Sequence, residues 1–226
     1  MVSATANASN LVINGSFEQV TSSGGGELGY NGFNATGWTT SGYNFLFPSG
    51  TSSPSGQYGG LSLYQGNAGT AIMPANSPDG GNFVAADGAF QVGAITQTVT
   101  GLTSLQQYTL GFWWAAAQQT TFGCTGTQTY CTTDQWQVGI GSQTFYTPVA
   151  NTGTTAGGFS GWLYQTFTFT ATSSSAVLSF LAVGTPVGQP PFALLDGVTL
   201  QATPEPGTLL LLTCGILALI FIRRAL

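Results

Sequence analysis

Apolar and polar residues alternate along most of the chain from residue 9 to residue 201, and clusters of Gly, Ser, Thr and Asn separate the alternating stretches. A period of two is typical of a β-strand with one buried face, and no stretch before residue 208 has the period of a helix. The clearest stripes are Tyr108, Leu110, Phe112 and Trp114; Trp136, Val138 and Ile140; and Leu163, Phe167 and Phe169. Further strands are expected at 10–13, 61–64, 82–85, 93–99, 176–183 and 192–200. About ten short strands predict an all-β fold, a two-sheet β-sandwich or jelly roll.

Charged residues make up only 4% of the 226 residues, against roughly 25% in typical soluble domains. Uncharged polar residues must provide solubility, which favours an extracellular surface. All seven acidic residues precede the two basic ones, Arg223 and Arg224. A negative surface repels phosphate backbones, so nucleic-acid binding is not expected. The absence of His and Lys excludes Ser-His-Asp and Cys-His catalysis, His metal sites and Schiff-base chemistry.

One apolar segment, residues 208–222, departs from the strand pattern near the C-terminus. Its 15 residues span about 22 Å as a helix, which is short against the roughly 30 Å hydrocarbon core of a bilayer. We predict a short transmembrane helix here, with a buried core helix as the less favoured alternative. Arg223 and Arg224 follow it and would act as a stop-transfer signal that keeps the C-terminus in the cytoplasm.

The same region carries a resemblance to a known signal. Pro204, Glu205 and Pro206, followed by the Leu-rich segment and the Arg pair, resemble the PEP-CTERM sorting signal of Gram-negative bacteria. The resemblance implies that residues 202–226 are a sorting signal that an exosortase, a membrane cysteine protease, cleaves near the Pro-Glu-Pro motif. The protein would be exported, membrane-anchored before cleavage, and afterwards located at the cell surface or in the extracellular matrix.

The N-terminal residues and the cysteines are interpreted in the light of export. Residues 1–8 contain a small-x-small pattern but no basic or apolar region, so we interpret them as the remnant of an export signal or a disordered start. Residues 9–201 would form the ectodomain. Cys124 and Cys131 flank a short polar loop and are expected to form a disulfide in an exported protein, whereas in a cytosolic protein they would be free thiols. Cys214 is expected to be a small apolar residue of the C-terminal helix.

Both ends of the ectodomain resemble galactose-binding-like jelly rolls, the fold of many carbohydrate-binding modules. The matching stretches are NLVINGSFE at 10–18 with Gly37-Trp38, and LLDGVTL at 194–200. In such modules the acidic residues of these two stretches often bind a structural calcium ion, which implies Glu18 and Asp196 as ligands here.

The residues themselves give independent support for a role of Asp196. Asp196 is in step with Phe192, Leu194, Val198 and Leu200, so an unbroken strand would turn its carboxylate towards the core. A buried carboxylate needs hydrogen bonds or a metal, and oxygen ligands without His or Cys favour calcium over zinc. The alternative is a carboxylate that accepts backbone N–H groups at a strand bend.

Aromatic residues outside the stripes are candidates for ligand binding, because exported jelly rolls bind sugars by stacking an aromatic side chain on the sugar ring. Trp113 faces away from the stripe around it, and Tyr164 lies near a polar loop. Each could instead pack at a strand edge. No two acidic residues form a recognisable pair for glycoside hydrolysis, so no catalytic residue is assigned.

These features predict an exported, non-catalytic bacterial surface or matrix protein that contacts extracellular polysaccharide. The main alternative is a structural or adhesive coat protein that binds no small glycan, and a glycoside hydrolase is less favoured. Thr166, Thr168 and Thr170 form a polar row that fits the coat protein, although β-propensity alone explains threonine in a strand.

Overall fold

The computed structural model describes residues 9–49, 54–63, 77–120, 122, 131–153 and 158–203, and each regular element in them is a β-strand. The strands of the first half are short: β1 (Gly26–Glu27), β2 (Thr39–Thr40), β3 (Asn44–Phe47), β4 (Ser55–Gly56), β5 (Gly59–Gly60), β6 (Phe83–Asp87) and β7 (Ile95–Thr100). The second half contains the long strands: β8 (Gln107–Gln118), β9 (Thr133–Ile140), β10 (Gln143–Tyr146), β11 (Ala150–Asn151), β12 (Leu163–Thr170), β13 (Ser175–Thr185) and β14 (Pro191–Ala202).

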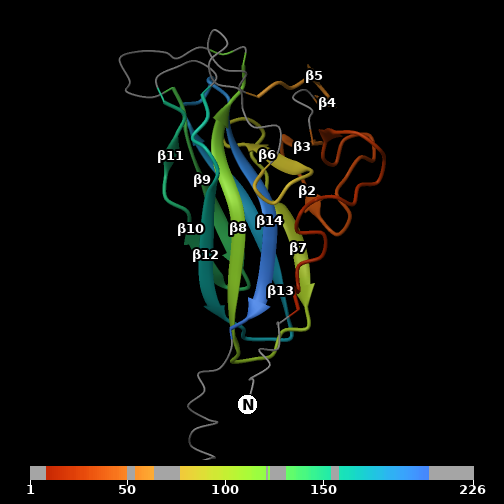
Figure 1. Ribbon diagram of the computed structural model, residues 1–226, viewed down its shortest axis with the longest axis vertical. Coiled ribbons are helices and arrows are strands. Elements are labelled where there is room, and N and C mark those ends of the chain that lie inside the picture. The colour runs from red at the N-terminus through yellow and green to blue at the C-terminus, as the bar shows by residue number, and fades with distance from the viewer. Residues whose placement is uncertain are drawn as a thin grey trace, which may run out of the picture.

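These strands form two sheets, which confirms the predicted two-sheet β-sandwich. The larger sheet has the order β12-β8-β14-β6-β3-β1-β4-β5, and the smaller has the order β10-β9-β13-β7-β2 with β11 paired to β9. Figure 1 shows β8 and β14 side by side along the length of the molecule. Nearly all pairs are antiparallel; β1 and β4 are parallel.

The core between the sheets is built by the stripes that the alternation predicts. Tyr108, Leu110, Phe112 and Trp114 of β8 are all buried, as are Trp136, Val138 and Ile140 of β9. The indole N–H of Trp136 donates to the carbonyl oxygen of Leu194 at 2.9 Å, which joins the smaller sheet to the larger one. This bond satisfies a polar group that would otherwise be costly to bury.

The larger sheet also has a second, separate apolar cluster on its outer face. Residues of β3, β6, β8 and β14 pack there beneath the segment 61–63, and the cluster contains Phe45, Phe47, Leu61, Leu63, Phe83, Ala115, Ala117, Phe192 and Leu194. β3 and β6 are therefore buried on both faces. Towards the other end of β8, β12 and β14 the outer face carries exposed residues such as Tyr164 and Thr166.

Two expectations about individual strands are wrong, and a third strand, β12 (Leu163–Thr170), is found where expected but has an exposed end. Residues 10–13 form a bend and turn, because the Asn10 side chain accepts the N–H groups of Val12 (3.0 Å) and Leu200 (2.8 Å) in place of a ladder. In 61–63 only Leu63 pairs, through a single bridge to Gln119. Leu163 is 41% exposed, because β12 is the outermost strand of its sheet and its first residues have no neighbour on one side.

Several predictions concern residues outside the described ranges. These are the Pro204-Glu205-Pro206 motif, the helix 208–222, Arg223, Arg224, Cys124, Cys214 and residues 1–8. Cys131 is buried and disulfide-bonded. Its pairing with Cys124 stays a prediction. Within the described ranges, no helix is long and apolar enough to cross a membrane. β14 extends to Ala202, one residue past the predicted end of the ectodomain.

Candidate functional site

A β-bulge in β14 decides which way Asp196 points. The register of β14 against β8 shifts between Asp196 and Thr199, and Gly197 has a φ of 57°, a left-handed conformation that favours glycine. The bulge reverses the alternation, so Phe192 and Leu194 belong to the outer cluster whereas Val198 and Leu200 belong to the inter-sheet core. The prediction that Asp196 faces that core is therefore wrong, and its carboxylate lies on the outer side of the larger sheet.

Asp196 is nevertheless fully buried. The Ser77 hydroxyl donates to Oδ2 of Asp196, while Oδ1 has no hydrogen-bond partner. Burial raises the pKa of Asp196 to about 8, against hydrogen bonds from Ser77 and Gly197 that lower it, and the negative charges of Asp79 and Glu18 raise it further. Three carboxylates thus influence one another at this point of the sheet.

The two predicted calcium ligands, Glu18 and Asp196, belong to this neighbourhood. Glu18 accepts the backbone N–H of Asn82 at 2.6 Å. The unpartnered Oδ1 of Asp196 fits a cation, since such an ion would satisfy a buried carboxylate oxygen. Among the described residues, no group of three or more His, Cys, Asp or Glu side chains has the arrangement of a metal site. Calcium therefore remains a proposal that rests on this single oxygen.

Trp113 and Tyr164, the two predicted ligand-binding residues, lie directly opposite each other on β8 and β12. Their ring centroids are 5.0 Å apart with an interplanar angle of 56°. Tyr164 is 53% exposed and Trp113 is half-buried. On its other side Trp113 is the register partner of Asp196 on β14. The structure thus brings three predicted site residues into one row across three strands.

Below this row the outer face is polar. The next row consists of Thr166, Gly111 and Thr199, and the following one of Thr168, Thr109 and Gln201. An added Cβ at Gly111 would lie 2.4 Å from the Tyr164 hydroxyl oxygen, so the glycine provides the room in which the tyrosine ring lies against the sheet. We call these three rows the β12–β8–β14 face. It combines an aromatic pair, of which Tyr164 is exposed, with hydroxyl and amide groups, which is the chemistry that neutral sugars require.

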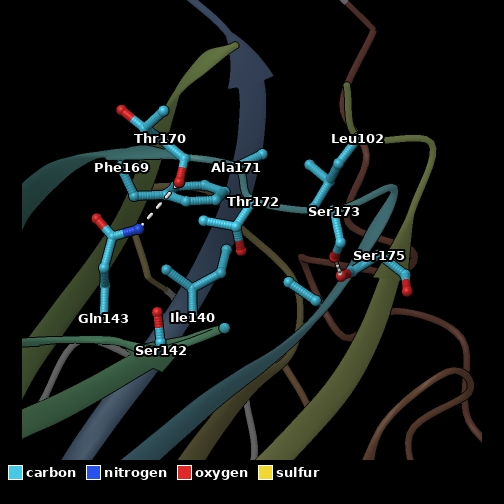
Figure 2. Close-up of a pocket in the computed structure, with 12 residues that line it drawn as sticks. Leu102, Ile140, Ser142, Gln143, Phe169, Thr170, Ala171, Thr172, Ser173 and Ser175 are labelled. Carbon is cyan, nitrogen blue, oxygen red and sulfur yellow. Dashed lines mark hydrogen bonds between the residues drawn. The ribbon is translucent and has the colours of Figure 1, made fainter. Parts of the chain in front are cut away.

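The cavity in Figure 2 lies at the end of the sandwich where β9 and β12 finish. Its volume is about 30 Å³, room for about one or two water molecules. The Gln143 side-chain N–H₂ donates to the carbonyl oxygen of Thr170 at 3.0 Å across its mouth. A sugar ring does not fit there, so this cavity is excluded as the site.

Three residues of the site were not singled out from the sequence. Ser77 and Asp79 come from a loop and reach β14 only in the folded chain. Asp79 lies in a turn, and an Asp-Gly pair in the sequence indicates a turn and not a site. Gly111 lies within a strand of larger residues. A glycine at such a position often marks the close approach of another group, and this signal could have identified Gly111 as part of the site.

No family model matches the sequence, and no curated protein matches it. Solved structures of similar shape include the module TmCBM61 in complex with β-1,4-galactotriose, with 12% identity over 87% of this chain and 100% of that one and a TM-score of 0.45. Another is the N-terminal cellulose-binding domain of Cellulomonas fimi β-1,4-glucanase C, with 15% identity over 88% and 100% and a TM-score of 0.38.

A third is the enzymatically active domain of bacteriophage CBA120 tailspike protein 4, with 13% identity over 86% of this chain and a TM-score of 0.39. The chain spans only 21% of that protein. Because all three TM-scores lie below 0.5, the function of this chain has to be inferred from its own residues.

Proposed function

We propose that this protein is an exported, non-catalytic surface or matrix protein whose galactose-binding-like jelly roll contacts a neutral extracellular polysaccharide through the β12–β8–β14 face. The observation that carries the proposal is the Trp113–Tyr164 pair, 5.0 Å apart at the edge of two rows of hydroxyl and amide groups. An aromatic pair offers the apolar face of a sugar ring a stacking surface, and the adjacent polar groups supply hydrogen bonds. Three successive rows of this kind suit an extended chain of sugars.

The charge of the face supports a neutral partner. It carries hydroxyl and amide side chains, and the nearby ionisable groups are the acids Asp196, Asp79 and Glu18. An anionic polysaccharide would find no basic side chain to pair with among the described residues, whereas a neutral one needs none. We propose in addition that residues 202–226 are a sorting signal. The helix 208–222 would anchor the protein in the membrane until an exosortase recognises the signal and cleaves it near Pro204-Glu205-Pro206.

The test measures binding of the protein to immobilised neutral polysaccharides, namely galactan, xylan, mixed-linkage glucan and cellulose. At least one should bind, and Trp113→Ala and Tyr164→Ala should each weaken that binding about tenfold, since a stacked aromatic contributes about 1–2 kcal/mol. Tyr146→Ala is the matched control, because Tyr146 is 54% exposed but lies on β10 in the other sheet.

Two results would overturn the proposal in different ways. If none of the polysaccharides binds, or if the two aromatic variants bind as well as the control variant, the structural or adhesive coat protein becomes the better interpretation. Release of reducing ends from a bound polysaccharide would show a glycoside hydrolase instead.

A further inference from the structure

A groove lies at the end of the sandwich where β6 and β8 finish and β14 begins. This loop-end groove has a volume of about 380 Å³, and its walls include Tyr43, Tyr58, Asp87, Phe90, Gln119 and Phe122. It lies at the opposite end of β14 from the polar rows of the β12–β8–β14 face, because Pro191 pairs with Gln118 whereas Gln201 pairs with Thr109. A ligand in the groove would therefore be separate from a polysaccharide on that face.

Three aromatic rings form one wall of the groove. The centroid of Phe90 is 5.3 Å from that of Tyr43 and 5.9 Å from that of Tyr58, in edge-to-face arrangements. Tyr58 is 62% exposed and Phe90 is 45% exposed, so both present ring surface to a ligand. Large exposed aromatic side chains that are not covered by the fold mark binding sites more often than isolated surface residues do.

A chain of hydrogen bonds fixes the position of Tyr58. Its hydroxyl oxygen accepts from the Gln91 amide at 3.0 Å, and the Gln91 carbonyl oxygen accepts from Gln57 at 2.8 Å. Gln57 in turn donates its side-chain and backbone N–H groups to the carboxylate of Glu27, at 2.8 and 2.7 Å. The aromatic wall is thus held in place before any ligand binds, which lowers the entropic cost of binding.

Asp87 places a carboxylate in the same groove. Its Oδ1 accepts the backbone N–H groups of Ala89 (2.8 Å) and Phe90 (2.9 Å), and these are the only hydrogen bonds to its carboxylate within the described part of the chain. Burial raises the pKa of Asp87 to about 6, against these two hydrogen bonds, which lower it. The carboxylate is therefore ionised at neutral pH.

No positive side chain offsets this charge among the residues that the structure describes, since the only two basic residues of the sequence are Arg223 and Arg224. Asp87 interacts electrostatically with Tyr43 and with Asp134 of β9, and Tyr43 in turn interacts with Glu27 and Tyr58. Burial, and after it the charges of Glu27 and Asp87, raise the pKa of Tyr43 to about 12. The groove therefore combines a negative potential with the negative faces of aromatic rings.

We propose that the loop-end groove binds an organic ammonium group, held over the exposed rings of Tyr58 and Phe90 and paired with the carboxylate of Asp87. The faces of aromatic rings attract cations, and this attraction is strongest where water is partly excluded. A neutral sugar would use the rings but not the carboxylate, and an anion would be repelled by it. The ammonium group could come from a choline headgroup or from an amino sugar of a polysaccharide, which share this chemistry.

The first experiment compares choline with its uncharged isostere 3,3-dimethylbutan-1-ol by calorimetry on the full-length protein. Choline should bind about tenfold more tightly or better, since the two differ only in charge. The charge of choline does not change with pH, so its affinity should rise as the pH rises through about 6, where Asp87 ionises. A second comparison, glucosamine against choline with glucose as the uncharged control, identifies the source: tighter binding of glucosamine than of choline points to an amino sugar.

Asp87→Asn is the decisive variant, because an asparagine oxygen can still accept the N–H groups of Ala89 and Phe90. It should lose the preference for choline and the pH dependence together. Asp79→Asn removes the same charge elsewhere and should retain both. Tyr58→Leu should weaken choline about tenfold with little change in stability, since Tyr58 is largely exposed, and it decides the matter if Asp87→Asn does not fold.

Equal affinity for choline and its isostere, or an affinity for choline that is unchanged in Asp87→Asn or in Tyr58→Leu, would overturn the proposal. Trp113→Ala tests whether the groove and the proposed polysaccharide site are independent. It should weaken polysaccharide binding to the β12–β8–β14 face about tenfold and leave choline binding unchanged, so each site can fail without the other.

Discussion

The hydroxyl of Ser77 donates to Oδ2 of Asp196 across 119 positions of the chain, and Oδ1 of the same carboxylate is buried without a partner. A hydroxyl from a loop thus fixes the orientation of an acidic side chain in the middle of the larger sheet. The arrangement leaves one oxygen that only a proton, a water molecule or a cation can satisfy.

Asp196 should make the protein less stable as the pH rises, and bound calcium should oppose this loss of stability. The folded protein holds the proton of Asp196 up to about pH 8, whereas the unfolded chain releases it near 3.8. The folded state therefore binds more protons, so the contribution of Asp196 to stability is largest below about pH 4 and is lost as the pH rises towards 8. Asp87, whose pKa is raised to about 6, contributes in the same direction. Melting curves in chelator should shift to lower temperature along this pH range.

Added calcium should stabilise the protein increasingly above pH 6, by about 5 °C at saturation, because the ion binds the ionised carboxylate in competition with the proton. Asp196→Asn should remove the calcium effect and reduce the loss of stability with pH. Identical melting curves in calcium and in chelator at pH 8 would favour the hydrogen-bonded carboxylate that was the alternative to a metal site.

Gly111→Ala should damage the proposed polysaccharide site without damaging the fold. The added methyl group would lie 2.4 Å from the Tyr164 hydroxyl oxygen, and the end of a half-exposed side chain can move away at little cost. We expect polysaccharide binding to fall about as far as in Tyr164→Ala, with a change in the free energy of unfolding below about 1 kcal/mol.

Gly139→Ala is the matched control, because its methyl group would lie 2.5 Å from the Ser179 hydroxyl on the other sheet. Both variants should melt near the temperature of the unmodified protein, and only Gly111→Ala should bind polysaccharide weakly. Full binding by Gly111→Ala would mean that the position of the Tyr164 ring is unimportant.

The pattern of alternation predicts β8 and β9 well, because each strand turns its stripe of large apolar residues towards the inter-sheet core, from Tyr108 to Trp114 in β8 and from Trp136 to Ile140 in β9. It fails for β14. Both faces of that strand are buried, with Phe192 and Leu194 on one side and Leu195 and Val198 on the other, so its alternation carries no information on direction. The bulge at Gly197 then reverses the faces, and a glycine in a strand does not by itself fix where the phase changes.

Some residues of the candidate site are predictable one by one, but their arrangement is not, and neither are Ser77, Asp79 and Gly111. Trp113 and Tyr164 each depart from the stripes around them, which is a local signal. Their contact depends on the register of β12 against β8, and the position of Ser77 depends on a loop that packs on β14. These are long-range relationships. They are decided by packing and by the turns at distant strand ends, which the pattern of a single strand does not contain.

The disulfide of Cys131 should include Cys124. Cys131 is disulfide-bonded in the structure, and the short loop between the two cysteines would lower the entropy of the unfolded chain. Reduction should lower the free energy of unfolding by about 2.5 kcal/mol. Non-reducing peptide mapping should recover one linked pair, with Cys214 as a free thiol. A cross-link between Cys131 and Cys214 would contradict the pairing.

Cleavage near Pro204-Glu205-Pro206 should leave the sandwich intact. β14 runs to Ala202, and the backbone N–H of Thr203 still donates to the carbonyl oxygen of Gln107 at 2.9 Å, so the last hydrogen bond of the larger sheet lies one residue before the motif. A protease that recognises the motif would therefore act just outside the folded domain.

In cells that contain an exosortase, intact-mass analysis of the exported protein should show the loss of residues 208–226. Replacing Arg223 and Arg224 by Glu should disturb the membrane orientation and reduce processing. A mature protein that retains the C-terminal segment in such cells would contradict the sorting role, while the melting temperature of the cleaved form should equal that of the full-length chain.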